Sequence, residues 1–183
     1  ISFEDMLYHK NYEAGSGSVI DLRPGLRDFL KDLSRKFEIV LFSDEDSQFM
    51  EEVVSTVDPY QMHFKYAFGR EFFAMHRGRY MKDYDYFNRD FRNVVIVDFN
   101  DKQNYNRREN LVLLGKYQGE NSDTSLNELK SFLLHCHKFE DVRKVIQNFG
   151  GTGCVENFVK QKSEYNAKIK KKKGFFASLF GKK

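Results

Sequence analysis

Three continuous apolar runs, at residues 39–42, 94–97 and 111–114, punctuate the chain and have the length of strands buried on both faces. Residues 1–8 are also rich in apolar positions but carry interleaved acids, which indicates the end of a strand entering a loop. Strands buried on both faces are typical of parallel sheets, because helices cover both sides of such sheets. The pattern therefore predicts a central parallel sheet.

Between these runs, apolar residues recur at intervals of three and four, which is the spacing of one helix face. A helix is expected after Arg23-Pro24-Gly25, since proline suits a first helical turn. A second should follow residues 39–42 with Ser43 or Asp44 as its cap, and a last one should run from about Val155 into the lysines. The stripes of the first four helices are Leu26, Phe29, Leu30 and Leu33; Phe49, Met50, Val53, Val54 and Val57; Leu126, Leu129, Phe132 and Leu133; and Val142, Val145, Ile146 and Phe149.

Residues 64–81 are typical of paired short strands with a turn at Arg77-Gly78, and residues 15–18 form a flexible turn before a short extended segment at 19–22. Helices that alternate with doubly buried strands predict an α/β fold with a mostly parallel sheet and a small β-hairpin insertion. Aromatic residues near the hairpin should pack as a flap or, as a second interpretation, line a hydrophobic docking groove; they are Phe72, Phe73, Tyr80, Tyr84, Tyr86 and Phe87.

Charge is distributed unevenly along the 183 residues, whose net charge is +3. From Lys160 to Lys183 there are nine lysines and one glutamate, whereas the other 159 residues carry 21 basic and 26 acidic groups. An acidic body argues against a nucleic-acid partner and favours a cationic one. No apolar run reaches the ~18 residues of a membrane span. Cys136 and Cys154 lack metal-ligand spacing, so we expect two free thiols.

Polar residues follow the ends of several predicted strands: Ser2 and Glu4, Ser43, and Asp98. In parallel α/β sheets, ligand-binding residues gather at the carboxyl ends of the strands. We therefore expect these side chains to share one crevice.

The sequence Arg-Pro-Gly-Leu-Arg-Asp-Phe-Leu at 23–30, followed by Phe-Glu-Ile-Val-Leu-Phe-Ser at 37–43, resembles the core of the FCP/SCP-type phosphatases of the haloacid dehalogenase superfamily. The likeness continues through Asp58-Pro59, residues 77–83, 88–90 and 94–98, Glu109-Asn110 and residues 140–142. It implies a three-layer α/β sandwich over residues 1–149, followed by a basic helix at 150–173 and a basic-aromatic tail at 174–183.

In active members of that family, one aspartate attacks phosphorus, a second protonates the leaving oxygen, and Mg²⁺ bridges the phosphate and the first carboxylate. The resemblance places Ser2 at the attacking position, Glu4 at the second, and Phe99 where active members give an oxygen to the metal. The other family positions are Met6 in place of a threonine, Ser43 and Lys82 as phosphate-holding groups, and Asp98 as an acid of the last motif. We predict a pseudophosphatase with no cofactor or metal, and we expect Mg²⁺ to be absent.

Within the family, residues 1–9, residues 140–146 and the lysine-rich helix are most similar to presequence-receptor subunits of the mitochondrial inner-membrane protein translocase. This likeness implies a domain at the mitochondrial inner membrane, on the intermembrane-space side or, if repurposed, on the matrix side, with an anchor upstream of Ile1. The implied partners are other subunits of an inner-membrane complex and basic presequence peptides, which are amphipathic and rich in arginine.

Five acids crowd the segment after the second predicted strand: Asp44, Glu45, Asp46, Glu51 and Glu52. One interpretation is an acidic rim that steers a cationic helix toward an apolar groove. The other is an ordinary solvated helix start, where acids interact favourably with the helix dipole. The sequence leaves both open.

The end of the chain combines lysines with an apolar face at helical spacing, formed by Lys170, Lys171, Lys172, Lys173, Phe175, Phe176, Leu179 and Phe180. This pattern is typical of anchoring on an anionic lipid surface, and the alternative is a frayed chain end. His135-Cys136-His137 does not predict a metal site, because zinc needs three or four convergent ligands. Two other functions stay open: a structural accessory subunit of a respiratory-chain complex, and a residual protein phosphatase.

Overall fold

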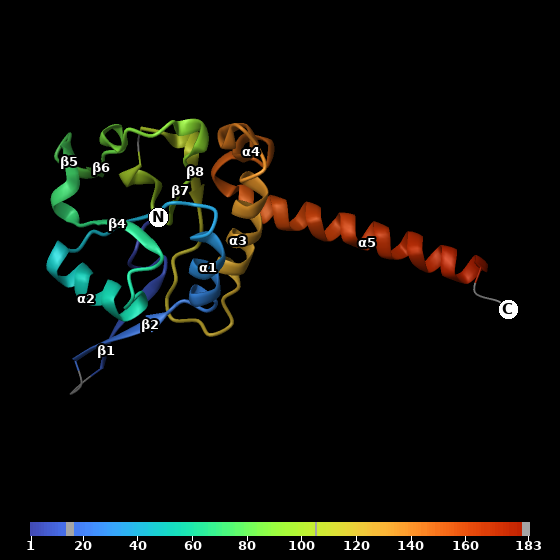
Figure 1. Cartoon of the computed structure of the whole chain (residues 1–183), viewed down its shortest axis with the longest axis horizontal. Helices are drawn as coiled ribbons and strands as arrows, with labels where there is room; N and C mark the ends of the chain where they lie inside the picture. Colours follow the sequence, from blue (N-terminus) through green and yellow to red (C-terminus); the bar gives the residue numbers. More distant parts are fainter. Residues whose placement is uncertain (14–16, 105, 181–183) are drawn as a thin grey trace.

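The computed structural model describes residues 1–13, 17–104 and 106–180. Strands and helices form a body in which the first residues of the chain lie near the centre, and α5 (Cys154–Phe180) projects from this body (Figure 1). Short 3-10 turns connect the larger elements; they are Arg70–Phe72, Asp85–Phe87, Phe91–Asn93, Asp101–Gln103, Arg108–Asn110 and Gly151–Gly153.

Two parallel strand pairs make the sheet. β3 (Ile39–Phe42) pairs with β4 (Phe64–Phe68), and β7 (Ile96–Asp98) pairs with β8 (Leu111–Leu113). β7 starts two residues later than the apolar run suggests, but the parallel pairing of both strand pairs and the burial of β7 and most of β3 confirm the α/β fold expected from the sequence.

The first three residues join the two strand pairs into one sheet. The backbone nitrogen of Ser2 donates to the carbonyl of Val97 (3.0 Å), and that of Phe3 donates to the carbonyl of Phe42 (2.9 Å). Phe42 in turn donates to the carbonyl of Ile1 (2.9 Å), and Ser2 and Phe42 form a parallel bridge. The segment therefore lies between β7 and β3, as a middle strand would.

Two antiparallel hairpins extend from the sheet. β1 (Tyr8–Glu13) pairs with β2 (Gly17–Leu22), and the predicted turn at 15–18 falls partly outside the described residues. β5 (Phe73–His76) pairs with β6 (Arg79–Lys82) around Arg77-Gly78, and both turn residues have positive φ. The prediction of paired strands over 64–81 was thus wrong in its first half, because β4 belongs to the parallel sheet.

The helix α2 (Ser47–Val57) packs beside β4, away from α1 (Leu26–Leu33) and α3 (Ser125–Cys136) (Figure 1). Its cap is Asp46, whose side chain accepts a hydrogen bond from the backbone nitrogen of Phe49 (3.0 Å). The predicted caps, Ser43 and Asp44, were therefore wrong; they lie in the loop that leaves β3 and bond to other residues there.

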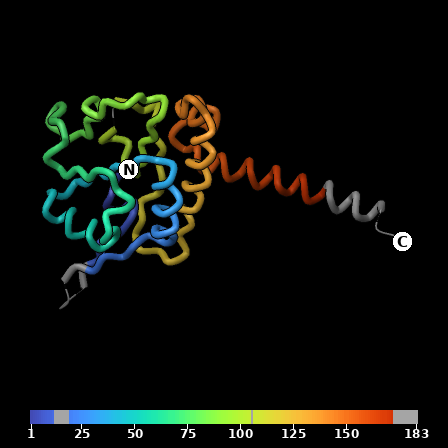
Figure 2. The backbone as a smooth tube through the Cα atoms, viewed as in Figure 1, coloured from blue at the N-terminus to red at the C-terminus, as the bar shows by residue number. Residues whose placement is uncertain are grey.

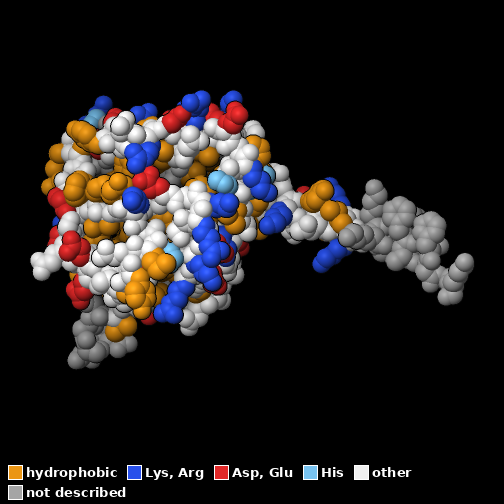
Figure 3. Space-filling model, in the orientation of Figure 1, with side chains coloured by type: hydrophobic (Ala, Val, Ile, Leu, Met, Phe, Trp, Pro, Cys, Tyr) orange, Lys and Arg blue, Asp and Glu red, His pale blue; other side chains and the backbone are white. Residues whose placement is uncertain are grey.

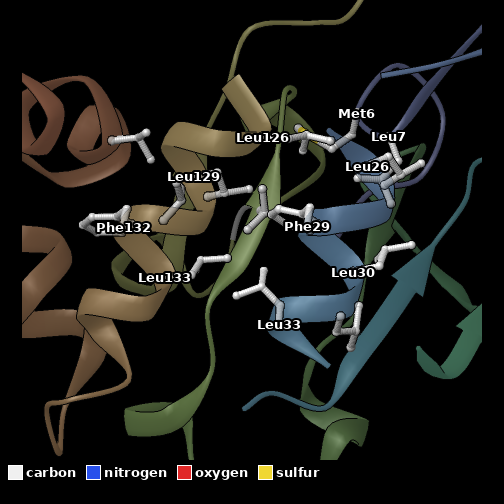
Figure 4. Packing of buried hydrophobic residues seen from close by; sticks show 14 of the residues in the cluster. Met6, Leu7, Leu26, Phe29, Leu30, Leu33, Leu126, Leu129, Phe132 and Leu133 are labelled. Atoms are coloured by element: carbon white, nitrogen blue, oxygen red, sulfur yellow. The ribbon is translucent and has the colours of Figure 1, made fainter. Parts of the chain in front are cut away.

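The core lies where α3 packs between α1 and α5. Figure 4 shows Phe29 and Leu33 of α1 facing Leu129 and Leu133 of α3, and all four side chains are buried, as the helical stripes predicted. α4 (Val142–Asn148) completes this helical side. A second, smaller cluster forms where the sheet meets the 3-10 turns, from Phe42, Phe73, Tyr84, Ile96 and Leu111.

The helix α5 leaves the body after its first turns, in which Cys154, Val155 and Phe158 are buried against the core. The tube in Figure 2 shows the rest of α5 extending away from the body. No backbone break separates the expected helix (150–173) from the expected tail (174–183), because α5 continues to Phe180. Among the described residues, no helix is long and apolar enough to cross a membrane.

Candidate functional site

Two of the strand-end residues, Ser2 and Asp98, meet in one buried crevice, where both contact Lys82; Ser43 is buried nearby but bonds to Glu45 and Phe68. Ser2 lies in the bridging segment, Ser43 directly follows β3, Asp98 ends β7, and Lys82 ends β6. The ammonium nitrogen of Lys82 is 2.6 Å from Ser2 Oγ and 2.5 Å from Asp98 Oδ2. All four residues are at most 5% exposed. The hairpin β5–β6 therefore delivers a lysine into the space between a hydroxyl and a carboxylate.

Asp98 is the most heavily hydrogen-bonded group of the crevice. Its Oδ1 accepts from the backbone nitrogens of Phe99 (2.7 Å) and Asn100 (3.1 Å), and its Oδ2 accepts from Asn104 Nδ2 (2.7 Å) as well as from Lys82. Burial alone would raise the pKa of Asp98, but the charge of Lys82 and the hydrogen bonds outweigh burial and hold this pKa below its usual value. Asp98 is therefore a stable anion held by this chain's own donors.

The residues at the other family positions are either hydrogen-bonded within the protein or apolar. Ser43 Oγ accepts from the backbone nitrogen of Glu45 (3.1 Å), and the Ser43 backbone nitrogen donates to Phe68 (2.9 Å). Met6 is fully buried in the hydrophobic core. Phe99 packs partly buried against the same core and offers only its backbone nitrogen to Asp98. The contacts in the crevice thus join the hydroxyl of Ser2, the ammonium of Lys82 and the carboxylate of Asp98.

Two residues of this network were not predicted from the sequence. Asn104 bridges Asp98 and the hydroxyl of Tyr84, which donates to Asn104 Oδ1. Tyr84 was predicted only as one of the hairpin aromatics, and its burial raises its pKa well above the usual value. Asn104 lies in a polar loop with no apolar pattern around it, so no periodic signal could have marked it.

The five acids near α2 do not act as one rim. Asp46 caps the helix, and Glu51 and Glu52 are exposed along α2. Asp44 is also exposed and accepts from Gln103 Nε2 (3.1 Å), whereas Glu45 lies nearer the body. Figure 3 shows acidic side chains along the edge of the body where α2 lies. The helix-start interpretation therefore holds for Asp46, whereas an acidic rim at Asp44 and Glu45 stays a prediction.

Glu4 adds a carboxylate to this group. It is half-buried, and burial, reinforced by the negative charges of Glu45 and Asp5, raises its pKa. Within the part of the chain that the structure describes, its side chain has no hydrogen bond or ion pair. The mouth of the crevice is therefore negative, although Lys82 neutralises its floor.

The hairpin aromatics divide between the two roles that the sequence left open. Phe73 and Tyr84 are buried in the smaller core cluster, while Phe72, Tyr80 and Tyr86 are exposed. An apolar groove of about 550 Å³ lies along β4; this aromatic groove is lined by Tyr66, Phe68, Phe72, Tyr86 and Phe87, with Val40 and Phe42 beneath and Glu38, Asp83, Asn88 and Arg89 at its edges. It adjoins the acidic loop, since Ser43 bonds to Phe68.

The basic end of the chain is solvated where its side chains are described. Lys170 and Lys171 are exposed on α5. The predictions for the side chains of Lys172, Lys173, Phe175, Phe176, Leu179 and Phe180 lie outside the side chains that the structure describes. On the face shown in Figure 3, a group of positive side chains, from lysines and arginines, also lies over α1 and α3.

Cysteine and histidine make no metal centre in the described ranges, where no group of three such residues or carboxylates could hold an ion. Cys136 and Cys154 are both free and buried, which confirms the expected thiols. His135 instead packs against Phe149 (5.8 Å between ring centres) and Phe158 (5.2 Å).

Comparison with known proteins gives three findings. Residues 3–143 match the model of a family described as NLI interacting factor-like phosphatase. The mitochondrial import inner membrane translocase subunit tim50 of Neurospora crassa is 35% identical over 98% of this chain and 34% of its own length. Subunit TIM50-A of Drosophila melanogaster is 30% identical over 81% of this chain and 44% of its own. The chain spans between about a third and two fifths of the length of the fungal relatives it matches.

Among solved structures, that of Fcp1, an essential RNA polymerase II CTD phosphatase, covers 95% of this chain and 55% of its own with a TM-score of 0.50 and 18% identity. At that identity the likeness concerns the fold, which is the haloacid-dehalogenase-like one expected from the sequence. The mitochondrial inner-membrane location expected from the sequence agrees with the location named for the translocase relatives. From the family match and the 35% identity over nearly its whole length, the chain belongs to the NLI interacting factor-like phosphatase family.

Proposed function

We propose that this chain is a catalytically inert phosphatase-like subunit that binds basic presequence segments at the mitochondrial inner-membrane translocase. One observation carries the proposal: the Lys82 ammonium lies between the Ser2 hydroxyl and the Asp98 carboxylate, within 2.6 Å of both. The hydroxyl at the family's attacking position therefore faces an ammonium that donates to it, and not a free base that could activate it.

Ser2 is a poor nucleophile in this setting. A serine needs a neighbouring base to remove its proton, and the neighbours of Ser2 Oγ are a lysine that donates to it and a carboxylate already bound by Lys82 and Asn104. Asp98 also has a lowered pKa, despite its burial, which makes it a weaker base. The crevice therefore lacks both the attacking group and a group to activate a substitute.

The same residues do not fit Mg²⁺. This ion needs near-octahedral oxygen ligands, but Phe99 gives none and both Asp98 oxygens already accept hydrogen bonds from protein donors. An ammonium beside the carboxylate would also repel a divalent ion. We therefore keep the expectation that the chain works without this cofactor.

The mouth of the crevice favours a positively charged partner. Glu4, Asp44 and Glu45 lie there, and the chain outside its C-terminal lysines is acidic. The aromatic groove beside these acids offers about 550 Å³ for apolar side chains. An amphipathic basic helix has one face for each surface, which is the form of a presequence. The translocase relatives support the proposal, because they are named as subunits of the mitochondrial import machinery of the inner membrane.

Two measurements test this function. The purified chain should not hydrolyse p-nitrophenyl phosphate with Mg²⁺; turnover that Ser43→Ala abolishes would support the residual-phosphatase alternative. In a second assay, a fluorescent presequence peptide should bind more tightly than the same peptide with every arginine replaced by citrulline. Equal or absent binding would contradict the proposal, and co-purification with respiratory-chain subunits would then favour the accessory-subunit alternative.

We also propose that α5 contacts an anionic lipid surface. Lys160, Lys162, Lys168, Lys170 and Lys171 are all partly or fully solvated on a helix that leaves the body. A basic residue near an anionic bilayer contributes about 1 kcal/mol to binding. The chain should therefore bind vesicles that contain cardiolipin and not pure phosphatidylcholine vesicles, and a variant ending at residue 159 should lose this binding. Equal binding by that variant would contradict the idea.

A further inference from the structure

A small cation site lies beside the mouth of the crevice and is filled by the protein's own Lys10. The ammonium of Lys10, on β1, is 4.0 Å from the centre of the Phe49 ring and 3.7 Å from Glu45 Oε1. It also acts electrostatically on Glu4. We call the group formed by Glu4, Glu45, Phe49 and Tyr8 the Lys10 site. Its resident shows which chemistry it accepts: a positive nitrogen on a long, unbranched stem.

The carboxylates of the Lys10 site are not fully neutralised. Glu45 has two cationic neighbours, Lys10 at 3.7 Å and Arg70 at 3.9 Å, and both distances exceed hydrogen-bond length. Glu4 has no ion pair or hydrogen bond among the residues described here. Asp5, by contrast, is held by Lys116 at 2.7 Å. Glu4 and Glu45 therefore retain capacity for another donor.

A buried hydroxyl without a partner provides an independent sign of a ligand. The Tyr8 side chain is fully buried, and its Oη has no hydrogen-bond partner in the described part of the chain. Tyr8 forms a backbone bridge with Glu4 and feels the charges of Glu4, Glu45 and Asp5. Buried polar atoms are rarely left unpaired without a reason. A phenol oxygen here can accept from a cationic N–H group and donate to a carboxylate.

We propose that the Lys10 site receives one guanidinium or ammonium side chain of a basic peptide, and that Lys10 is a built-in competitor that leaves as the peptide enters. The inference rests on the proposed function and names a contact within it. A guanidinium can bind the Glu4 and Glu45 carboxylates through its fork of donors and stack on Phe49. Tyr8 is fully buried, so a ligand reaches its hydroxyl only when a covering side chain moves, and Lys10 is one of the long, flexible side chains at this site.

The competitor role has an energetic logic. Lys10 offsets the mutual repulsion of Glu4 and Glu45 when no peptide is present, so the empty site is not a source of instability. The contact between Lys10 and Glu45 is longer than a hydrogen bond and only partly desolvated, hence weak. An arginine that makes direct, bidentate contacts gains more than the departing lysine loses. The site therefore discriminates against weakly basic segments.

Fluorescence anisotropy with the full chain and a labelled amphipathic peptide carrying four arginines and no acids tests the proposal at 150 mM salt, where long-range charge effects are screened. Glu4→Gln should weaken binding about fivefold or more, and Glu45→Gln should weaken it in the same direction. Lys10→Met should tighten binding about threefold or more. Matched charge controls are Glu140→Gln and Lys144→Met, two exposed residues near α4.

The outcomes separate this inference from the proposed function. The inference is supported if peptide binding becomes tighter in Lys10→Met but not in the control Lys144→Met. Binding should also become weaker in Glu4→Gln or Glu45→Gln but not in the control Glu140→Gln. The Lys10 site is ruled out if the wild type binds the peptide and Lys10→Met, Glu4→Gln and Glu45→Gln all bind it equally well, with circular dichroism showing that every variant is folded. The proposed function would still hold in that case. No peptide binding by the wild type or any variant overturns both.

Discussion

The ammonium nitrogen of Lys82 lies 2.6 Å from the hydroxyl oxygen of Ser2, although the two residues are 80 positions apart in the chain. This contact joins the hairpin β5–β6 to the middle of the sheet through one buried side chain. Because Lys82 also pairs with Asp98, a single lysine holds three segments together at the place where the family performs its chemistry. The crevice has become part of the framework of the fold.

Replacing Lys82 should therefore destabilise the protein. Lys82→Met leaves the Asp98 carboxylate buried without its counter-charge, which costs about 3–5 kcal/mol in comparable buried pairs. The free energy of unfolding measured in urea should fall by an amount in that range. Lys130→Met, which removes a partly exposed pair with Asp32, is the control and should have little effect. Equal stability of the two variants would contradict the assigned role of Lys82.

Acid should unfold the protein through its buried carboxylates. Burial would raise the pKa values of Asp98 and Asp123, but Lys82 and Arg23 respectively reverse the shift and lower them; in Asp58, three backbone N–H groups do so. A carboxyl with a lowered folded pKa contributes stability above its unfolded pKa and loses it as pH falls through the folded value.

We therefore expect the urea midpoint to fall most steeply below about pH 4, near the ordinary aspartate pKa. The measurement is a set of urea unfolding curves between pH 7 and pH 3. The slope at low pH should be reduced in Asp123→Asn, because one of the three carboxyls is then absent. A midpoint that is the same at pH 5 and pH 3 would argue against this account.

Arg23 is a second buried charge whose loss should be costly. Its guanidinium binds both oxygens of Asp123 (2.9 Å each) and donates to the carbonyls of Met6 and Gly115 (3.1 Å each). Arg23→Met strands the Asp123 carboxylate and two carbonyls, so the free energy of unfolding should fall by about 3 kcal/mol or more.

Arg23→Lys should recover only part of this loss, since an ammonium cannot reproduce the planar fork that binds the carboxylate and two carbonyls at once. Arg35→Ala, at an exposed position, is the control. Full stability of Arg23→Lys would mean that charge alone matters at this position, contrary to the observed geometry.

The two thiols should be unreactive in the folded protein. Burial raises the pKa of Cys136, with a further contribution from Cys154, to about 12, and burial raises that of Cys154 to about 12 as well. Alkylation requires the thiolate, so iodoacetamide at pH 8 should label neither residue until urea is added. Mass spectrometry gives the number of labels, and rapid labelling of either cysteine in the native protein would show that α3 and α5 separate readily.

Much of the fold could be predicted because its signal is periodic. The stripe of Leu26, Phe29, Leu30 and Leu33 is buried as expected, and the strand at 39–42 lies where its apolar run indicated. The crevice was also predictable, since Ser2, Ser43 and Asp98 end neighbouring strands, a position that follows from parallel topology alone.

Other features depend on contacts between distant residues and leave no local pattern. The sequence predicted β4 as half of a hairpin because the segment is short and directly precedes the other short strands. In the structure it pairs with β3 in the parallel sheet. The cap of α2 is Asp46 and not a predicted residue. Ser43 instead bonds to Phe68 and Glu45, and Asp44 bonds to Gln103. The roles of Asn104 and Lys10 depend on neighbours that the fold brings beside them: Asp98 and Tyr84 for Asn104, and Glu45 and Phe49 for Lys10.

The position of residues 1–3 in the sheet has a consequence for how this chain reaches its native state. These residues cannot complete their ladder until β3 and, much later in the chain, β7 are present. Closing so long a loop carries an entropic cost that local contacts do not offset, so topology predicts slow, late zippering of the sheet. During synthesis, residues 1–3 emerge before β3 and β7 and should remain unpaired until both are made, so their apolar side chains stay exposed in the meantime.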